Sequence, residues 1–307
     1  MSITIFSAPK PFTDPRIAKI QRNAIGSWLN IGDQVEVILL GDDQGIGEAA
    51  AQLGAIHLPS VDRNAQQTPL INSIFAEAQS HSQHPTLAFV NTDIILMSDF
   101  LTSVEEIALQ QLNYLVVGQR WDLDEDVELK FEAGWDQALR SRLESKGTLH
   151  PPAGSDYFVF PRDQFGKLPP FALGRAGWDN WMIFRARNMR IPVVDATNAI
   201  TVVHQAHDYG HLEGSLPHYG LEESRENVRL GGGPETIFTL ADATWRMNGQ
   251  GLVRIPWPQG GLKRWGESAL VARFASRNNL RLLRALLHPM EFAQGVEAWA
   301  LRRFGRV

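Results

Sequence analysis

A polar triplet interrupts an otherwise apolar run in this chain of 307 residues, and its residue types could hold a cation. Within residues 87–97 the polar side chains are Asn91, Thr92 and Asp93. In an extended chain Asn91 and Asp93 project to the same side. A carboxylate buried among apolar neighbours is unfavourable unless it has a partner, so we expect Asp93 to hold a metal ion, an arginine or several backbone donors. The alternatives are that Asp93 caps a helix near Asp99 or satisfies a turn.

Further polar groups stand where strands and helices are expected to begin or end. They are Gly154-Ser155-Asp156, Trp178-Asp179-Asn180 and His204. The first precedes an apolar run and, by itself, is equally typical of a turn. Asp179 opens a segment of helical period, where an N-cap aspartate is common. His204 ends an apolar run, and a lone histidine there is more often structural than a ligand.

In order along the chain, these four groups resemble the landmarks of GT-A glycosyltransferases, most closely bacterial family-two-like enzymes. Asn91-Thr92-Asp93 is similar to the Asp-x-Asp motif, with Asn in place of the first Asp. The resemblance covers residues 2–211. It implies a nucleotide-diphosphate sugar as donor, linked to UDP or GDP, and a divalent cation, Mn²⁺ or Mg²⁺, that neutralises the departing diphosphate.

The resemblance also implies a role for each group. Asp93 and His204 would hold the metal, and Asp179 would be the base of an inverting transfer to a hydroxyl of a glycan or other acceptor. The residues implied to face the donor sugar and the acceptor are Gly154, Ser155, Asp156 and Trp178. The residues implied to bind the donor are Ser7, Ala8, Pro9, Asp42, Asn91, Thr92 and Asp93, with Arg63 as a partner for phosphate.

Other functions remain open at this point. The histidines and aspartate His204, His207, Asp208 and His211 would suit a zinc hydrolase, although their spacing matches no zinc signature. A sugar nucleotidyltransferase would share the α/β core, but its basic, glycine-rich loop would have to lie in residues 7–12, where Lys10 is the only cation. A non-catalytic nucleotide- or sugar-binding protein is the third alternative, because Asn91 departs from the motif. Neither a P-loop nor a Gly-x-Gly-x-x-Gly signature is present.

The elements that must position these residues follow an α/β pattern. Strand-like apolar runs alternate with segments of helical period at residues 3–7, 17–29, 35–40, 45–53, 55–58, 69–78 and 86–90. This order predicts a Rossmann-like, mostly parallel central sheet flanked by helices. Helices are also expected at 101–111 and 178–188, and strands at 114–118, 156–160 and 199–204. We predict a catalytic domain over residues 1–215 and a helical C-terminal extension over residues 216–307.

Composition supports an ordinary globular protein and separates the C-terminal part from the rest. The hydrophobic fraction is 44%, the charged fraction is 21%, and there is no cysteine, which excludes disulfides and thiolate metal sites. With no signal-like start and no apolar run of about 18 residues, we expect a cytoplasmic protein. From residue 262 onward nine Lys/Arg face three acids, so this part carries +6 and the remainder −11.

The basic C-terminal part reads as amphipathic helices with two interpretations. The helices would pack on the catalytic core or on a second copy of the chain. Alternatively they would lie on an anionic membrane surface, where Lys and Arg combined with Trp and Phe suit the interface. Nucleic-acid binding is not expected, because the net charge of the whole chain is −5.

Overall fold

The computed structural model describes residues 2–124, 128–205, 218–256, 261–276 and 279–290. Its main sheet has nine strands in the order β13-β12-β10-β6-β9-β4-β1-β2-β3, and within it only β9 and β13 run against the others. The predicted mostly parallel sheet is therefore confirmed. The strands are β1 (Ile3–Ser7), β2 (Val35–Leu40), β3 (Ile56–Leu58), β4 (Thr86–Val90), β6 (Leu115–Val117), β9 (Tyr157–Pro161), β10 (Val193–Asp195), β12 (Trp245–Asn248) and β13 (Gly251–Arg254).

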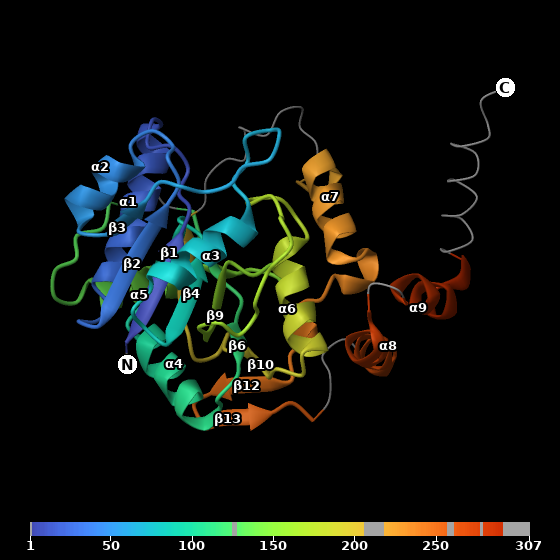
Figure 1. Cartoon of the computed structure of the whole chain (residues 1–307). Helices are drawn as coiled ribbons and strands as arrows, with labels where there is room; N and C mark the ends of the chain where they lie inside the picture. The colour runs from blue at the N-terminus through green and yellow to red at the C-terminus, as the bar shows by residue number, and fades with distance from the viewer. Residues whose placement is uncertain (1, 125–127, 206–217, 257–260, 277–278, 291–307) are drawn as a thin grey trace.

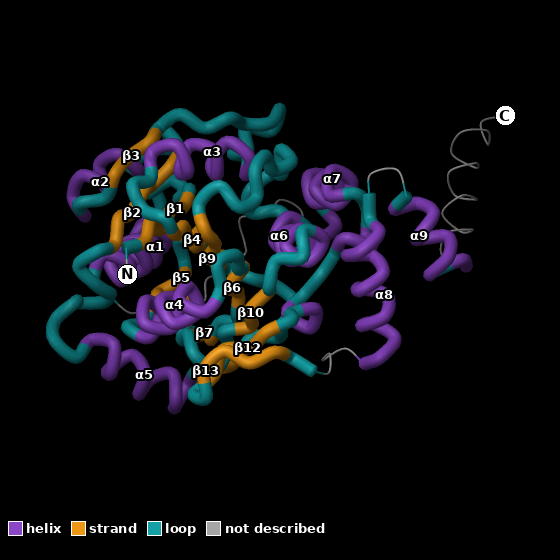
Figure 2. The backbone as a smooth tube through the Cα atoms, turned by 60° about the horizontal axis from the view of Figure 1, so that its bottom comes forward, coloured by secondary structure: helices purple, strands orange, loops and turns teal. Residues whose placement is uncertain are grey.

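Helices cover both faces of this sheet, as predicted, and each face has its own core (Figures 1 and 2). On one face α1 (Pro15–Leu29), α2 (Ile46–Leu53) and α4 (Asp99–Gln110) bury Trp28 and Phe100. On the other, α3 (Ile71–His81), α6 (Trp178–Asn188) and α8 (Gly261–Phe274) bury an aromatic cluster around Phe75. Burial on both faces explains the continuous apolar runs of the central strands.

A second sheet of four strands, in the order β5-β11-β7-β8, stands beside the first. Its strands are β5 (Ile94–Leu96), β7 (Trp121–Leu123), β8 (Thr148–Leu149) and β11 (Val202–Gln205). Helix α5 (Trp135–Lys146) packs Leu139 and Leu143 against one face of this sheet. The sequence predicted the strand at 199–204, and the pattern of the charged segment 120–149 indicates helix in part, which α5 confirms. The two partner strands that this segment supplies were not predicted.

The polar triplet lies at the carboxyl edge of the main sheet. Strand β4 ends at Val90, beside the ends of β1 and β2, and the antiparallel strand β9 begins there with Tyr157 opposite Val90. In open α/β sheets this edge is where ligands bind. The chain order therefore brings the segments after β1, β2 and β4, and the segment before β9, to one side of the molecule.

The chain beyond residue 217 contributes to the main sheet as well as to helices. The proposed boundary at residue 215 falls outside the described residues, and β12 and β13 extend the main sheet. The helices of this part are α7 (Glu222–Gly231), α8, α9 (Leu280–Leu287) and the short 3₁₀ turns His218–Gly220, Pro234–Thr236 and Leu240–Asp242. Of the helices in the described ranges, none combines the length and apolar character that crossing a bilayer requires.

Candidate functional site

The register of the small sheet brings together the two predicted metal ligands. His204 on β11 pairs with Asp122 on the parallel strand β7 and with Ile94 on β5. Residues in register on neighbouring strands carry their side chains on the same face, and His204 Nδ1 lies 3.0 Å from Asp122 Oδ1. Asp93 directly precedes β5, and its Oδ2 lies 3.7 Å from His204 Nε2.

This pair fits a divalent cation. Two ligands each about 2.1 Å from one ion stand at most about 4.2 Å apart, so the 3.7 Å between Asp93 Oδ2 and His204 Nε2 is within range. The carboxylate of Asp122 on the other ring nitrogen is the arrangement that metal-binding histidines usually have. Within the described ranges no group of three or more His, Asp or Glu side chains could hold an ion. In a complex with the donor, the diphosphate and water would complete the coordination of a cation held by Asp93 and His204.

Asp122 was not predicted from the sequence, and it is held from two further sides. It accepts a hydrogen bond from Arg120 Nε at 2.9 Å and lies 2.7 Å from His150 Nδ1. Burial raises the pKa of Asp122, but the combined effect of His150, Arg120 and His204 is larger and lowers it below its usual value. The carboxyl group therefore stays ionised. Burial lowers the pKa of His204, and Asp93 raises it by more, which gives a net increase. The alternation of polar residues 120 and 122 was the only sequence signal for this network.

Asp156 links the triplet to the same network. Arg120 Nη1 lies 2.9 Å from each carboxylate oxygen of Asp156, and Asn91 Nδ2 donates to Asp156 Oδ1 at 3.0 Å. Asn91 therefore supports Asp156, and an aspartate at position 91 would set two carboxylates against each other. The departure from the Asp-x-Asp motif has a local physical reason. Asp93, Asp122 and Asp156 thus lie in one network with Arg120 and His204.

A buried glutamine joins the triplet to the segment after β1. Gln21 Oε1 accepts from Lys10 N–H at 2.7 Å and from Thr92 Oγ1 at 3.1 Å, and Gln21 Nε2 donates to the Lys10 carbonyl at 3.0 Å. Burial lowers the pKa of Lys10, while the charge of Asp93 raises it and that of Arg175 lowers it. Lys10 thus lies near Asp93, whereas Arg175 is paired with Glu223 at 2.7 Å. The predicted donor-binding residues Ser7, Ala8 and Pro9 stand at the end of β1 and directly after it.

Asp179 lies in the first turn of α6, beside the glycine loop. The N-cap position of α6 is Gly177. Asp179, two residues further on, accepts a hydrogen bond from the Gly177 N–H at 3.3 Å, so its carboxylate also caps the start of the helix. A Cβ placed on Gly154 would lie 3.9 Å from Asp179 Oδ2, and Asn180 Nδ2 donates to the Ala153 carbonyl. Burial raises the pKa of Asp179 to about 6, and the charge of Asp156 adds to this. The side chain keeps part of its surface accessible.

The start of α6 is anchored by its neighbours. Trp178 is only 4% exposed, and its ring packs against Phe75, Phe89 and Phe158. Gly177 has a φ of 105°, which only glycine adopts readily, and a Cβ there would lie 3.1 Å from a methyl group of Val228 on α7. This burial favours an anchoring role for Trp178, while Asp179 is the polar group presented at the helix start. Ser155 is also buried.

On the donor side, the structure pairs Arg63 with two carboxylates. Arg63 Nη2 donates to Asp42 Oδ1 and to Asp43 Oδ2, both at 2.8 Å. Asp42 stays largely exposed beyond this bond, with a side-chain exposure of 69%. The charge of Arg63 is already neutralised by these two carboxylates, which disfavours phosphate binding by Arg63. The arrangement instead favours a role for Arg63 in orienting Asp42 toward a base or ribose.

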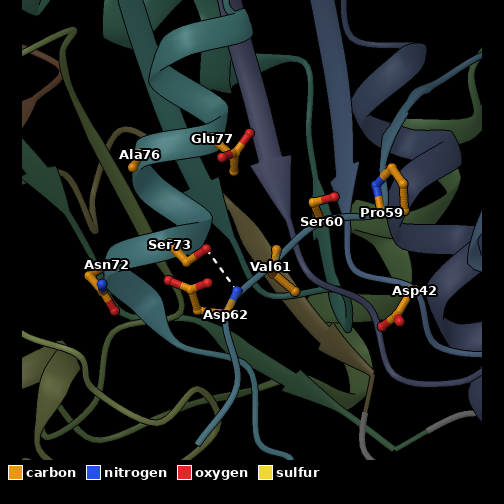
Figure 3. Close-up of a pocket in the computed structure, with 9 residues that line it drawn as sticks. All are labelled: Asp42, Pro59, Ser60, Val61, Asp62, Asn72, Ser73, Ala76 and Glu77. Atoms are coloured by element: carbon orange, nitrogen blue, oxygen red, sulfur yellow. Dashed lines mark hydrogen bonds between the residues drawn. The ribbon is translucent and has the colours of Figure 1, made fainter.

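A pocket of about 550 Å³ opens next to Asp42 (Figure 3). Its other walls are the segment Pro59–Asp62 and the side chains of α3, where Asp62 N–H donates to Ser73 Oγ. The volume is typical of small-molecule pockets. Asp42, Asp62 and Glu77 line it, so it suits hydroxyl and N–H groups better than phosphates. Asp42 is the one predicted site residue among its lining residues.

The histidine cluster that would suit a zinc hydrolase cannot be placed. His207, Asp208 and His211 lie outside the described residues, whereas His204 belongs to the Asp93 and Asp122 network. The part of the site that the structure describes therefore consists of the triplet, the Gly154 loop, the start of α6, and His204.

Asp122→Asn is expected to weaken cation binding by about 10- to 100-fold, because the outer partner that orients a metal-binding histidine typically contributes that much. Calorimetric titration of the protein with Mn²⁺, in the presence of UDP or GDP, measures the change in cation affinity. Asp124→Asn, an exposed neighbour on the same segment, is the matched control. Equal affinities of the Asp122 variant and the parent protein would exclude this role.

In overall structure the chain resembles GT-A nucleotide-sugar glycosyltransferases. One solved structure is a mannosyltransferase from Pyrobaculum calidifontis in complex with GDP-Man and Mn²⁺, with 14% identity and a TM-score of 0.44. The match covers 68% of this chain and 58% of the mannosyltransferase. A second is TarS from S. aureus in complex with UDP-GlcNAc, with 11% identity, a TM-score of 0.47, and coverage of 76% of this chain and 66% of TarS.

A third similar structure is glucosyl-3-phosphoglycerate synthase from Mycobacterium tuberculosis in complex with Mn²⁺, UDP and glucosyl-3-phosphoglycerate. Here the identity is 17%, the TM-score is 0.46, and the match covers 84% of this chain and 87% of the synthase. No protein family profile and no curated protein matches the sequence. At these values the likeness concerns the arrangement of sheet and helices, and no residue role is taken from it.

Proposed function

We propose that the protein is a metal-dependent glycosyltransferase of the hexosyltransferase type, which moves a sugar from a UDP- or GDP-linked donor to an acceptor hydroxyl. The observation that carries this proposal is the cation-sized separation of Asp93 and His204, with Asp122 behind the imidazole, at the carboxyl edge of the sheet. Asp179 belongs to the same region, because the charge of Asp156 acts on both Asp179 and His204.

The positions of the strands fit one extended donor. Strands β4 and β2 are two strand steps apart in the sheet, which is about 9–10 Å. A nucleotide with its diphosphate at Asp93 and its base or ribose near Asp42 bridges such a distance. Lys10, on whose pKa the charge of Asp93 acts, would attract the phosphates.

Each residue then has a defined part in an inverting transfer. A divalent cation bound by Asp93 and His204 would neutralise the charge that develops on the departing diphosphate. Asp179 accepts the proton of the acceptor hydroxyl as that oxygen attacks the anomeric carbon, and one displacement inverts this carbon. Gly154, which leaves open space beside the Asp179 carboxylate, admits the sugar and the acceptor to the base.

A thermal-shift screen of nucleotide sugars, with and without Mn²⁺, tests the proposal. We expect one UDP- or GDP-linked sugar to raise the melting temperature only when the cation is present, and slow donor hydrolysis to release UDP or GDP. A nucleotidyltransferase would instead release pyrophosphate from a nucleoside triphosphate and a sugar phosphate. Binding without any donor turnover would indicate a non-catalytic module.

The rate should depend on pH through Asp179. Its pKa is raised from 3.8 to about 6 by burial, and a general base acts only when ionised. We therefore expect kcat, measured at saturating donor and Mn²⁺, to rise about tenfold per pH unit below pH ~6 and to level off above it. Saturation removes the separate effect of His204 protonation on cation binding. A flat profile between about pH 5 and pH 7 would contradict the assignment.

A further inference from the structure

Exposed apolar side chains are concentrated at the C-terminal end of the described chain. Half of the large apolar residues that the described part exposes lie within residues 262–290. Single exposed apolar residues are ordinary, but a local concentration marks an interaction surface. We call this set the C-terminal apolar face, and it consists of Leu262, Trp265, Leu270, Phe274, Leu282, Leu286 and Met290.

Helix α8 is fixed to the protein by its opposite side. Ser268, Val271 and Ala272 are buried, and Arg264 binds Asp242 at 2.8 Å. The outward side of the same helix carries Leu262, with 67% exposure, and Leu270, with 44%. A helix that only packed on the catalytic core would carry polar residues there, so the apolar outward side needs another explanation.

Helix α9 repeats this arrangement. Leu287 packs against the main core, and Leu283 is partly buried. Leu282 and Leu286, one turn apart, are 62% and 69% exposed. Both helices lie at the side of the molecule farthest from α2 and β3 (Figure 1). A surface that contacts them therefore leaves the pocket next to Asp42 open.

The charge of the C-terminal part indicates what kind of surface the C-terminal apolar face would bind. Lys263 and Arg273 lie on the exposed side of α8 among the apolar residues. Lys263 Nζ is 3.9 Å from Glu267 Oε1, but its side chain stays 87% exposed and can still face a partner. From residue 262 onward nine Lys/Arg stand against three acids, whereas the rest of the chain carries −11. Two copies of a segment with this net charge would repel each other, while an anionic surface would attract it. Basic residues interspersed with Trp, Phe and Leu on one helical face suit the headgroup region of a membrane.

We propose that the C-terminal apolar face binds the surface of an anionic lipid bilayer, with Leu282 and Leu286 in the acyl boundary and Lys263 and Arg273 at the headgroups. The inference goes beyond glycosyl transfer and does not depend on it. It is measured without donor, so its failure would leave the proposed activity untouched.

Co-sedimentation of the full chain with vesicles tests the proposal. We expect binding to phosphatidylcholine vesicles that contain phosphatidylglycerol, weaker binding at high salt, and little binding to pure phosphatidylcholine. Leu282→Gln with Leu286→Gln should reduce the affinity by about tenfold or more for each leucine. Lys263→Gln with Arg273→Gln should reduce it by about thirtyfold.

The control is Leu109→Gln with Leu112→Gln, two residues near the end of α4 that are even more exposed, at 83% and 91%, and lie outside the face. This pair should bind vesicles like the parent protein. The proposal is wrong if the parent protein ignores anionic vesicles, if it binds both lipid compositions equally, or if the control pair loses as much affinity. It is also wrong if ultracentrifugation shows a dimer that the Leu282 and Leu286 variant dissociates while vesicle binding is absent.

Discussion

Asp179→Asn is expected to lower kcat by about 10²- to 10⁴-fold, the usual contribution of a positioned general base, and to leave donor affinity unchanged. Asparagine has the same shape and can still accept the backbone N–H of Gly177, but it cannot take a proton. Single-turnover kinetics together with calorimetric binding of the donor separate the two effects.

The stability of this variant provides an internal check. Because the folded protein raises the pKa of Asp179 to about 6, the ionised carboxylate destabilises the fold at neutral pH, and its neutral replacement should not lower the melting temperature. The matched control is Asp163→Asn, an exposed residue after β9 at the opposite edge of the sheet. If Asp179→Asn keeps near-normal turnover, the base lies elsewhere or the enzyme retains configuration.

Asp93→Ala is expected to abolish the cation-dependent part of nucleotide binding. Loss of an outer partner alone typically costs 10- to 100-fold in metal affinity, so removal of the ligand itself should cost at least about 100-fold. Calorimetry of UDP and GDP with and without Mn²⁺ measures this difference. Any affinity that remains without the cation would come from contacts such as Asp42 and Lys10.

Asp33→Ala is the control for this experiment, because Asp33 is exposed and lies two residues before β2 at the far edge of the sheet. It should bind nucleotide like the parent protein. An Asp93→Ala protein that still binds UDP or GDP more tightly when Mn²⁺ is added would disprove the metal assignment, and with it the proposed mechanism.

The main sheet could be predicted because its central strands are buried on both faces. Runs such as Val35–Leu40 and Thr86–Val90 are apolar except for Glu36 and Thr86, and their alternation with helices leaves few topologies. The strands of the small sheet were harder to recognise. The segment Trp121–Leu123 has three residues and one charged side chain, and its partners lie far along the chain. Short strands of this kind depend on tertiary pairing that local pattern does not reveal.

Some residues of the candidate site could be predicted from the sequence, and others could not. Asp93, Asp179 and His204 stand out because each polar group interrupts or ends an apolar pattern, and the structure brings Asp93 and His204 together. Asp122 had no such contrast, because charged residues precede and follow it at Arg120 and Asp124. The partners of Arg63 were also not predictable, since Asp42 and Asp43 reach it across the sheet edge.

The pairing of β7 with β11 has a consequence for how the site can change. In a strand, neighbouring side chains alternate between faces, so a slip of one residue would turn His204 or Asp122 toward α5. Leu123 and Val203 already occupy that face, packed with Leu139 and Leu143. The apolar contacts of α5 therefore fix the register of β7 and β11 that places the imidazole of His204 beside the carboxylate of Asp122. Substitutions of Leu139 or Leu143 in α5 would therefore affect the contact between His204 and Asp122 on the opposite face of the small sheet.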